Sequence, residues 1–345
     1  MRFAHSQEHL ELRDGAREYL RERCTAERLR AWFEGGDDET FAWPELIEMG
    51  LPGFLAPESL GGLGMDAAGF ALLMEEAGYV ALPEPLADVA GVSAPLLAAI
   101  PGQEDTLAEL CSGATRVLVA HPLNPHLNGL QASDQLLLLG DDIILVDAQR
   151  IELESAESID PLRRLRRLVG APGEGERLAS GETARALTRD ASLRGAVFGA
   201  AELLGLGSAM LDRSRDYACE RKQFGRAIGS YQSIKHHLAN AFVRLEFARP
   251  VVYRAAASLG SEQAGITVAQ ARVAAIEAVT EVAEIAIQVH GAMGYTFEVD
   301  LHLWMKRAWA MSGCWGDRNH HLAILETALL NGSLKAGPSQ TFGRS

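Results

Sequence analysis

The chain has 345 residues, of which 48% are apolar and 23% charged, and its formal net charge at pH 7 is −14. This length predicts two or three domains with a core that needs no disulfides. The acidic balance argues against a nucleic-acid-binding protein, which needs clustered positive charge, and no apolar run reaches the roughly 18 residues of a membrane span. The four cysteines lie far apart and the first residues carry no apolar leader, so we expect a cytoplasmic protein without a metal site.

Residues 1–112 are rich in Ala, Leu and Glu and predict an N-terminal helical domain. Pro44 suits the first turn of one helix, since proline has a helical φ and lacks only an unneeded donor. Asp66 is a candidate N-cap for a later helix. The loop at 56–64, marked by a proline and three glycines, separates the two.

Residues 113–182 predict a β domain. Short apolar runs occur at 116–120, 136–139 and 143–146, and Gly140-Asp141-Asp142 lies between the last two. Two strand-like runs joined by turn residues are typical of a β-hairpin.

From 183 to 331 apolar residues recur in alternating steps of three and four, which predicts long helices packed as a four-helix bundle. Pro250 falls inside one of these stripes and predicts a kink or an adjusted turn. We expect residues 332–345 to form a flexible tail.

The segment 215–239 places unusual chemistry at a predicted helix–turn–helix corner. Arg221, Gln223 and Phe224 precede Gly225, where the first helix breaks, and Gln232 begins the next helix. A guanidinium offers a planar fork of donors to phosphate oxygens, and a phenylalanine offers a flat apolar face. The residues alone also fit a surface arginine beside a buried phenylalanine.

A second segment, 288–298, lies where a later bundle helix stops. Gln288 is followed by Gly291 and by the pair Gly294-Tyr295. Glycine lets a backbone approach a ligand closely, although glycine also ends helices routinely. The residues alone leave both interpretations open.

These two segments and the loop at 56–64 together resemble the acyl-CoA dehydrogenase family. The first is similar to that family's Arg-x-Gln-Phe-Gly signature, and the second to its Gln-x-x-Gly-Gly-x-Gly-Tyr/Phe signature. The resemblance covers roughly residues 1–330 in domain order. It implies a mainly α fold with a helical N-terminal domain, a small β-barrel-like middle domain and a C-terminal four-helix bundle.

The resemblance also implies a reaction: FAD-dependent α,β-dehydrogenation of an acyl-CoA thioester, with a glutamate as base and an acceptor such as an electron-transfer flavoprotein. In the family, contacts from these motifs reach FAD held chiefly by a neighbouring subunit. The residues that would make these contacts here are Arg221, Gln223, Phe224, Gln232, Gln288 and Gly291.

The catalytic base is where the family pattern fails. Its usual position falls on Trp315, whose indole nitrogen only donates, and an alternative family position falls on Gly195. Asp317 and Glu202 are the nearest carboxylates, and Asp317 is the first candidate for a substitute base. Each also fits an ordinary surface, capping or interface carboxylate.

The middle domain departs from the family as well. Residues 114–180 lack the family's Thr-Glu-Pro and Trp-x-Thr/Ser-Asn segments around the flavin and form a shorter domain. Asp160-Pro161-Leu162-Arg163 resembles the usual exit from that domain. The arginines at 163–167 fit either a site for CoA phosphates or a solvated face.

Three hypotheses remain. In the first, the chain is the degenerate subunit of a hetero-oligomeric acyl-CoA dehydrogenase and pairs with a complete subunit, as in bacterial steroid-degrading members of the family. This single hypothesis explains both the FAD-contacting residues that are retained and the base and flavin contacts that are missing. Alternatively, it is a self-sufficient homo-oligomer, a dimer or tetramer, with an unusual base, or a scaffold protein without flavin. The sequence does not identify the acyl group.

Overall fold

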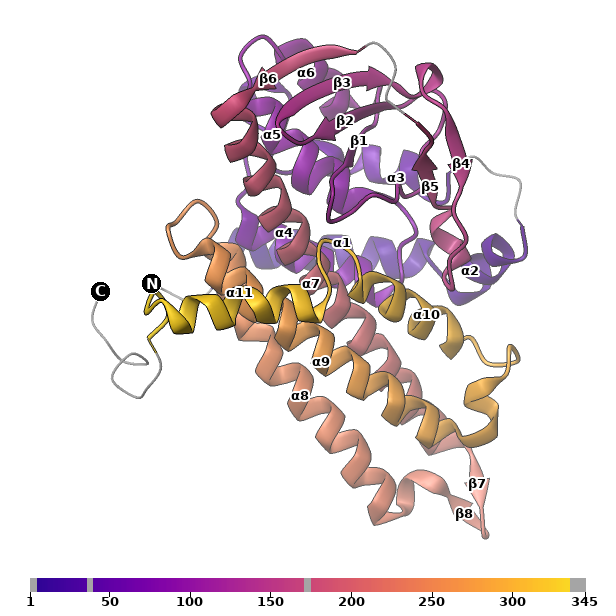
Figure 1. Cartoon of the computed structure of the whole chain (residues 1–345). Coiled ribbons are helices and arrows are strands. Elements are labelled where there is room, and N and C mark those ends of the chain that lie inside the picture. Colours follow the sequence, from indigo (N-terminus) through magenta and orange to yellow (C-terminus); the bar gives the residue numbers. More distant parts are fainter. Residues whose placement is uncertain (1–4, 36–39, 171–174, 336–345) are drawn as a thin grey trace.

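The computed structural model describes residues 5–35, 40–170 and 175–335, and its elements follow the predicted order of helical domain, β domain and helical bundle (Figure 1). The predicted flexible tail lies largely outside the described residues, since the description ends at 335. The expected fold class, mainly α with a central β domain, is confirmed.

The N-terminal domain is helical as predicted. The two helix starts are confirmed: Pro44 lies in the first turn of α3, and the Asp66 side chain accepts a hydrogen bond from the backbone N–H of Gly69 at 2.9 Å, which caps α4. Its elements are α1 (Gln7–Arg23), α2 (Ala26–Phe33), α3 (Trp43–Glu48), the short helices η1 (Leu51–Gly53) and η2 (Glu58–Leu60), α4 (Ala67–Tyr79), the π-helix η3 (Ala87–Ser93), α5 (Ala94–Ala98) and α6 (Glu104–Ser112).

The middle domain holds a four-stranded sheet in the order β1-β2-β3-β6. Its strands are β1 (Val117–Ala120), β2 (Gln135–Leu139), β3 (Asp142–Asp147) and β6 (Glu176–Ser180). The predicted hairpin is confirmed, because β2 and β3 pair antiparallel with Leu139 opposite Ile143. A separate pair joins β4 (Leu153–Ser155) to β5 (Arg166–Leu168), next to the short helices η4 (Ala148–Arg150) and η5 (Pro161–Arg163).

The C-terminal bundle begins with α7 (Gly181–Glu220), continues with α8 (Gln232–Ala257) and α9 (Ala264–His290), and ends with α10 (Leu301–Ser312) and α11 (Arg318–Leu330). Helix α8 runs through Pro250 without ending. Its predicted inward stripe is confirmed by the burial of Ala241, Leu245 and Val252. Helix α7 is long and apolar enough to cross a membrane, but 83% of its most apolar window is buried inside the protein, as expected of a core helix.

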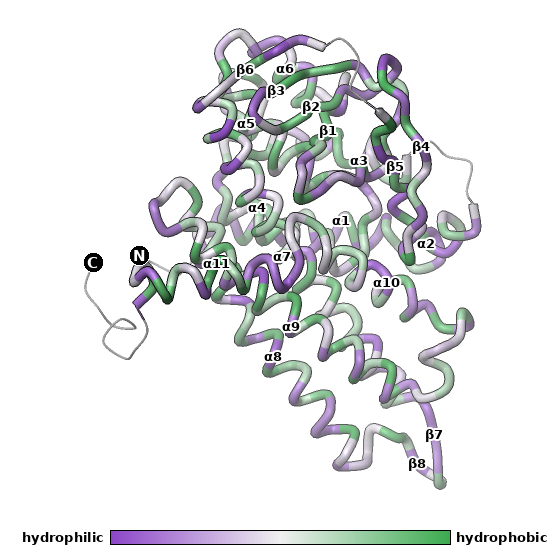
Figure 2. The backbone as a smooth tube through the Cα atoms, in the orientation of Figure 1, coloured by the Kyte–Doolittle hydropathy of each residue, from purple (hydrophilic) through white to green (hydrophobic). Residues whose placement is uncertain are grey.

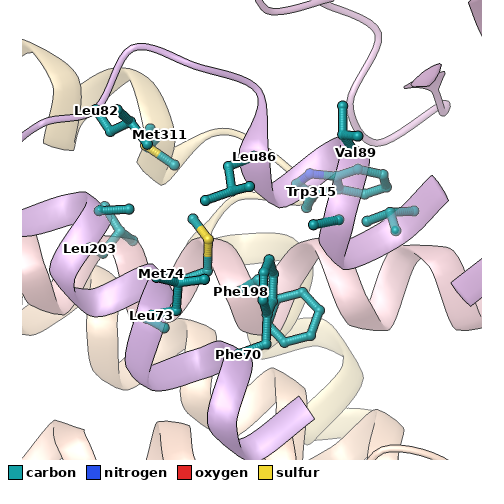
Figure 3. Close-up of a cluster of buried hydrophobic side chains, with 14 of the residues drawn as sticks. Phe70, Leu73, Met74, Leu82, Leu86, Val89, Phe198, Leu203, Met311 and Trp315 are labelled. Atoms are coloured by element: carbon teal, nitrogen blue, oxygen red, sulfur yellow. The ribbon is translucent and has the colours of Figure 1, made fainter. Parts of the chain in front are cut away.

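The three domains share one apolar core. Figure 3 shows a part of it in which side chains from α4, η3, α7 and the end of α10 meet, among them Phe70, Leu86, Phe198 and Met311. The ring centroids of Phe70 and Phe198 lie 4.7 Å apart in an edge-to-face arrangement. Trp315 belongs to this cluster, which makes it part of the core where the chain passes from α10 to α11.

Candidate functional site

The first sequence motif forms a two-stranded hairpin at the end of the bundle. Helix α7 ends at Glu220, β7 (Lys222–Gln223) pairs with β8 (Arg226–Ala227), and the turn residues Phe224 and Gly225 both have positive φ, +51° and +81°. The Tyr231 hydroxyl donates to the Gln223 carbonyl at 3.2 Å and secures the hairpin against the start of α8. Figure 2 shows β7 as a hydrophilic segment that leads away from the apolar bundle.

Phe224 is 93% exposed, so the sequence-based alternative of a buried phenylalanine is wrong. A bulky residue with φ near +50° is a backbone outlier that costs on the order of 1–2 kcal/mol. The chain gains no internal packing in return. Such strain at an exposed aromatic points to a contact outside the chain.

The second motif lies beside the first at the same end of the bundle. The Tyr217 ring, near the end of α7, stacks on the His290 ring at the end of α9 with centroids 4.3 Å apart. Gly291 follows with φ +61° and begins the short helix η7 (Gly291–Tyr295). Arg221, Gln223, Gln232, Gln288 and Gly291 are all exposed. The structure thus presents both motifs at one end of the bundle (Figure 1).

The two positions that the family resemblance assigns to the base come together in space, although 120 residues separate them. A Cβ atom built on Gly195 would lie only 2.2 Å from the Trp315 indole, so the indole occupies the space of any side chain at position 195. Trp315 is 4% exposed and has φ +56°. Neither position provides a carboxylate, and the space between them is filled by a ring.

Hydrogen bonds hold the turn that carries Trp315. The buried Arg272 guanidinium donates to the carbonyls of Met311 at 3.1 Å and Cys314 at 2.7 Å, which satisfies groups that the end of α10 leaves unpaired. The His321 ring contacts the Trp315 carbonyl at 3.0 Å through Nε2. The indole also neighbours the buried Asp88 carboxyl and lowers its pKa against the larger, opposite effect of burial.

Asp317, the first candidate for a substitute base, is the N-cap of α11. Its carboxylate accepts a hydrogen bond from the backbone N–H of His320 at 2.8 Å and is exposed. This is the placement of an ordinary capping carboxylate.

Glu202 is buried, so of the surface, capping and interface roles considered for it the surface role is wrong. It belongs to an ionic cluster formed by all three domains. Arg307 from the bundle pairs with Asp160 from the middle domain, lies 3.9 Å from Glu202 and donates to the Leu82 carbonyl at 2.7 Å. Such buried charges are stable only when they are paired and hydrogen-bonded.

Burial raises the pKa of Glu202 to about 7, although the neighbouring Arg307 and Arg163 partly oppose the shift. Burial also raises the pKa of Asp88 to about 6. In both carboxyl groups the loss of water disfavours the charged form.

Three of the arginines at 163–167, namely Arg163, Arg164 and Arg166, line one cavity of about 890 Å³. Arg163 is buried, with its guanidinium 3.2 Å from the Cys314 sulfur, so the interpretation as a solvated face is wrong for it. The Arg164 guanidinium lies over the Trp32 ring, 3.3 Å from the centroid. Within residues 5–35, 40–170 and 175–335, no three His, Cys, Asp or Glu side chains gather as a metal site would require.

Sequence reasoning missed Asp88 and Arg272. Each interrupts an otherwise apolar stretch: Asp88 lies between Leu86 and Val92, and Arg272 precedes the stripe of α9. A charged residue in such a stretch is a signal of a buried partner, because unpaired charges are not buried. The identity of the partner is not encoded in the stretch itself.

Comparisons with known proteins bear on the whole chain. Family models described as "Acyl-CoA dehydrogenase, N-terminal domain" and "Acyl-CoA dehydrogenase, C-terminal domain" match residues 6–100 and 192–330. The chain is 31% identical to the acyl-CoA dehydrogenase IpdE2 of Mycolicibacterium smegmatis over 326 residues, which cover 93% of this chain and 98% of the relative.

Two solved heteromeric structures share the fold. The Tcur3481-Tcur3483 steroid ACAD (G363A variant) matches with a TM-score of 0.84 and 25% identity, over 95% of this chain and 99% of that one. The ChsE4-ChsE5 complex from Mycobacterium tuberculosis matches with a TM-score of 0.84 and 22% identity, over 97% of this chain and all of that one.

FAD is the cofactor of the acyl-CoA dehydrogenase family, and a solved structure described as the FAD complex of PigA shares the fold with a TM-score of 0.80 and 19% identity. The exposed guanidinium, amides and glycine backbone of the two motifs fit part of a site for a phosphate-bearing, flat-ringed molecule. The relatives match over nearly their whole length, and both motifs lie in the region of the C-terminal family model. The chain belongs to the acyl-CoA dehydrogenase family.

Proposed function

We propose that this chain is the degenerate subunit of a hetero-oligomeric acyl-CoA dehydrogenase, meaning the subunit that has lost part of the family's active site. The complex oxidises an acyl-CoA thioester to the α,β-unsaturated product. In this role the chain donates its two exposed motifs to FAD that a homologous partner subunit holds. The partner supplies the catalytic base and the flavin cradle.

The contact between Trp315 and Gly195 carries this proposal. Both positions at which the family places its base are occupied by residues that cannot accept a proton, and the indole fills the space between them. Asp317, the nearest carboxylate in sequence, is already engaged as a helix cap. The chain therefore has no carboxylate at either position that its family uses for the base.

The exposed motifs support the donor role. Arg221 can contact phosphate oxygens through its planar fork, Gln223 can hydrogen-bond polar edges, and Phe224 can lie against a flat ring. FAD supplies the hydride-accepting chemistry when it is bound. The residues of this chain contribute orientation and binding to it, and no proton transfer.

A partner chain also has an apolar surface to cover. Helix α8 lies at the outer edge of the bundle (Figure 1) and exposes Phe242, Val243 and Phe247 by 53%, 46% and 73%. Neighbouring exposed apolar groups on one helix mark an interaction surface. The heteromeric neighbours favour a homologous partner subunit, and the steroid ACAD among them favours a steroid-derived acyl group.

Co-expression with a homologous, base-containing acyl-CoA dehydrogenase subunit from a neighbouring gene tests the proposal. We expect the two chains to purify together as a yellow complex that oxidises a steroid-derived acyl-CoA with an artificial electron acceptor. Full activity of the partner alone, with unchanged flavin content, would contradict the donor role.

The alternative to this proposal is a self-sufficient homo-oligomer in which Glu202 acts as the base. Its raised pKa of about 7 is in the range suited to a general base, which a self-sufficient homo-oligomer would require. Turnover by the chain alone, abolished by Glu202→Gln with FAD still bound, would favour that alternative over the subunit role.

A further inference from the structure

We propose that a cavity between the N-terminal and middle domains is a second binding site, which takes a phosphate ester with an apolar body. The cavity has a volume of about 890 Å³. All the described residues that line it lie between 32 and 166, so they belong neither to the bundle nor to the two motifs at 215–239 and 288–298. The inference goes beyond the proposed function and does not depend on it.

The walls of the cavity are held by hydrogen bonds. Helix α2 lies on one side, where the Trp32 indole donates to the Leu162 carbonyl at 2.9 Å and joins the two domains (Figure 1). On the other side, β5 is fixed by backbone hydrogen bonds of 2.8 and 2.9 Å between Leu127 and Arg166 and by pairing of Arg166 with Ser155 in β4. The volume falls in the range of small-molecule sites, about 300–1,000 Å³.

Three guanidinium groups contribute to the lining. Arg163 is 6% exposed, and its guanidinium donates to the Cys314 sulfur, which is a weak acceptor, at 3.2 Å. The Arg164 guanidinium lies over the Trp32 ring, which fixes its plane. Arg166 is half-buried and forms no ion pair within the described part of the chain. Buried positive charge of this kind is stabilised by an anion that accepts several hydrogen bonds.

The carboxylates of the lining do not neutralise these arginines. Asp160 pairs with an arginine of α10, and Glu84 accepts hydrogen bonds from two backbone N–H groups at 2.6 and 2.7 Å. Glu157 is exposed. A fourth arginine of the lining, Arg116, is itself paired with Asp134 at 2.6 Å. The cavity is therefore a positive site in a chain whose net charge is −14.

The donors and the apolar groups of the lining together select the ligand. Arg163, Arg164 and Arg166 offer three planar donor forks, which suit the three terminal oxygens of a phosphate better than a single carboxylate. The hydroxyls of Ser155 and Ser158 lie in the same lining and add donors. A phosphate ester fills both parts, because its organic body can cover the apolar residues of the lining, which include Pro83, Leu130, Ala132 and Leu165.

Isothermal titration calorimetry of the full-length chain tests the proposal with ADP and hexyl phosphate as probes. We expect saturable binding of one molecule per chain at submillimolar concentration. Binding of ADP but not hexyl phosphate identifies a nucleotide site, and the reverse identifies a site for alkyl phosphates. Adenosine, which carries no phosphate, should not bind.

Arg166→Met and Arg167→Met form a matched pair, because neighbouring side chains of a strand point to opposite sides. Arg166 lines the cavity, whereas Arg167 is exposed and pairs with Glu154. Arg166→Met should weaken binding of the phosphate ester by at least about tenfold, and Arg167→Met should leave it unchanged. Arg221→Ala should also leave it unchanged, since Arg221 lies in the first motif and outside the cavity lining.

Failure of wild type to bind either phosphate ester saturably would overturn the proposal. Equal weakening by Arg166→Met and Arg167→Met would also overturn it, because general attraction to surface charge would then explain the binding. Loss of binding in Arg221→Ala would place the phosphate at the first motif instead. These titrations need neither FAD nor a partner, so they can fail while the partner-subunit role stands, and the co-expression experiment can fail while they succeed.

Discussion

Two aromatic residues of this chain share an unusual backbone and differ in everything else. Phe224 has φ +51° and is 93% exposed at the tip of the β7–β8 hairpin, whereas Trp315 has φ +56° and is 4% exposed in the core. Burial of the Trp315 indole in the space beside Gly195 offsets the strain of its positive φ. Phe224 gains no packing within its own chain. The difference contrasts an exposed aromatic side chain, which we propose contacts another molecule, with one that fills the interior of its own chain.

The buried position should be the more sensitive of the two. Arg272→Met removes the donor shared by the carbonyls of the turn that carries Trp315. Unpaired buried carbonyls cost about 1–3 kcal/mol each, so we expect a loss of about 4 kcal/mol in the free energy of unfolding, measured by urea denaturation. Arg189→Met on the exposed face of α7 is the control. An equally small effect of both variants would show that the hydrogen bonds from Arg272 do not stabilise the turn.

The ionic cluster that contains Glu202 should make stability depend on pH. Because the pKa of Glu202 is raised to about 7 when folded, the folded chain holds a proton that the unfolded chain releases above its ordinary pKa of 4.5. The contribution of Glu202 to stability should therefore fall as pH rises from about 4.5 to 7, by on the order of 3 kcal/mol. His121 and His321 contribute in the opposite sense, because burial lowers the pKa of each to about 4.

Glu202→Gln should remove the Glu202 contribution, so the stability of the variant should rise more steeply with pH than that of wild type. Asp88, whose pKa is raised to about 6, makes a smaller contribution of the same sign as Glu202, and Asp88→Asn should remove it. Urea midpoints from pH 4.5 to 8 measure the effect. The same pH dependence in wild type and in Glu202→Gln would show that Glu202 is ionised in the folded chain across this range.

The exposed site should tolerate change in the isolated chain. Phe224→Gly relieves an unfavourable φ and removes a side chain without internal contacts, so the free energy of unfolding should stay within about 1 kcal/mol of wild type. In the complex with a partner, the same variant should lose flavin during gel filtration. Retention equal to wild type would exclude Phe224 from the flavin contact.

The smallest effect is expected at Asp317. Asparagine caps helices as well as aspartate does, so Asp317→Asn should change stability by less than about 0.5 kcal/mol and leave turnover of the complex intact. A large loss of turnover with flavin still bound would instead make Asp317 the base.

The sequence predicts local features of this molecule well and long-range contacts poorly. Asp66, Pro44 and the turn at 140–142 act on their own neighbours, so their patterns suffice to place a cap, a helix start and a hairpin. Periodicity identifies the buried face of a helix but not the helix that covers it. The meeting of Trp315 with Gly195, and of Arg307 with Asp160, depends on how domains pack and could not be predicted this way.

The flavin content of the purified chain tests the central claim most directly. The absorption spectrum of the chain produced alone should show no bound flavin, and the chain purified with a homologous partner should carry flavin that the partner's base-containing site requires. Stoichiometric FAD on the chain alone, retained through gel filtration, would contradict the account.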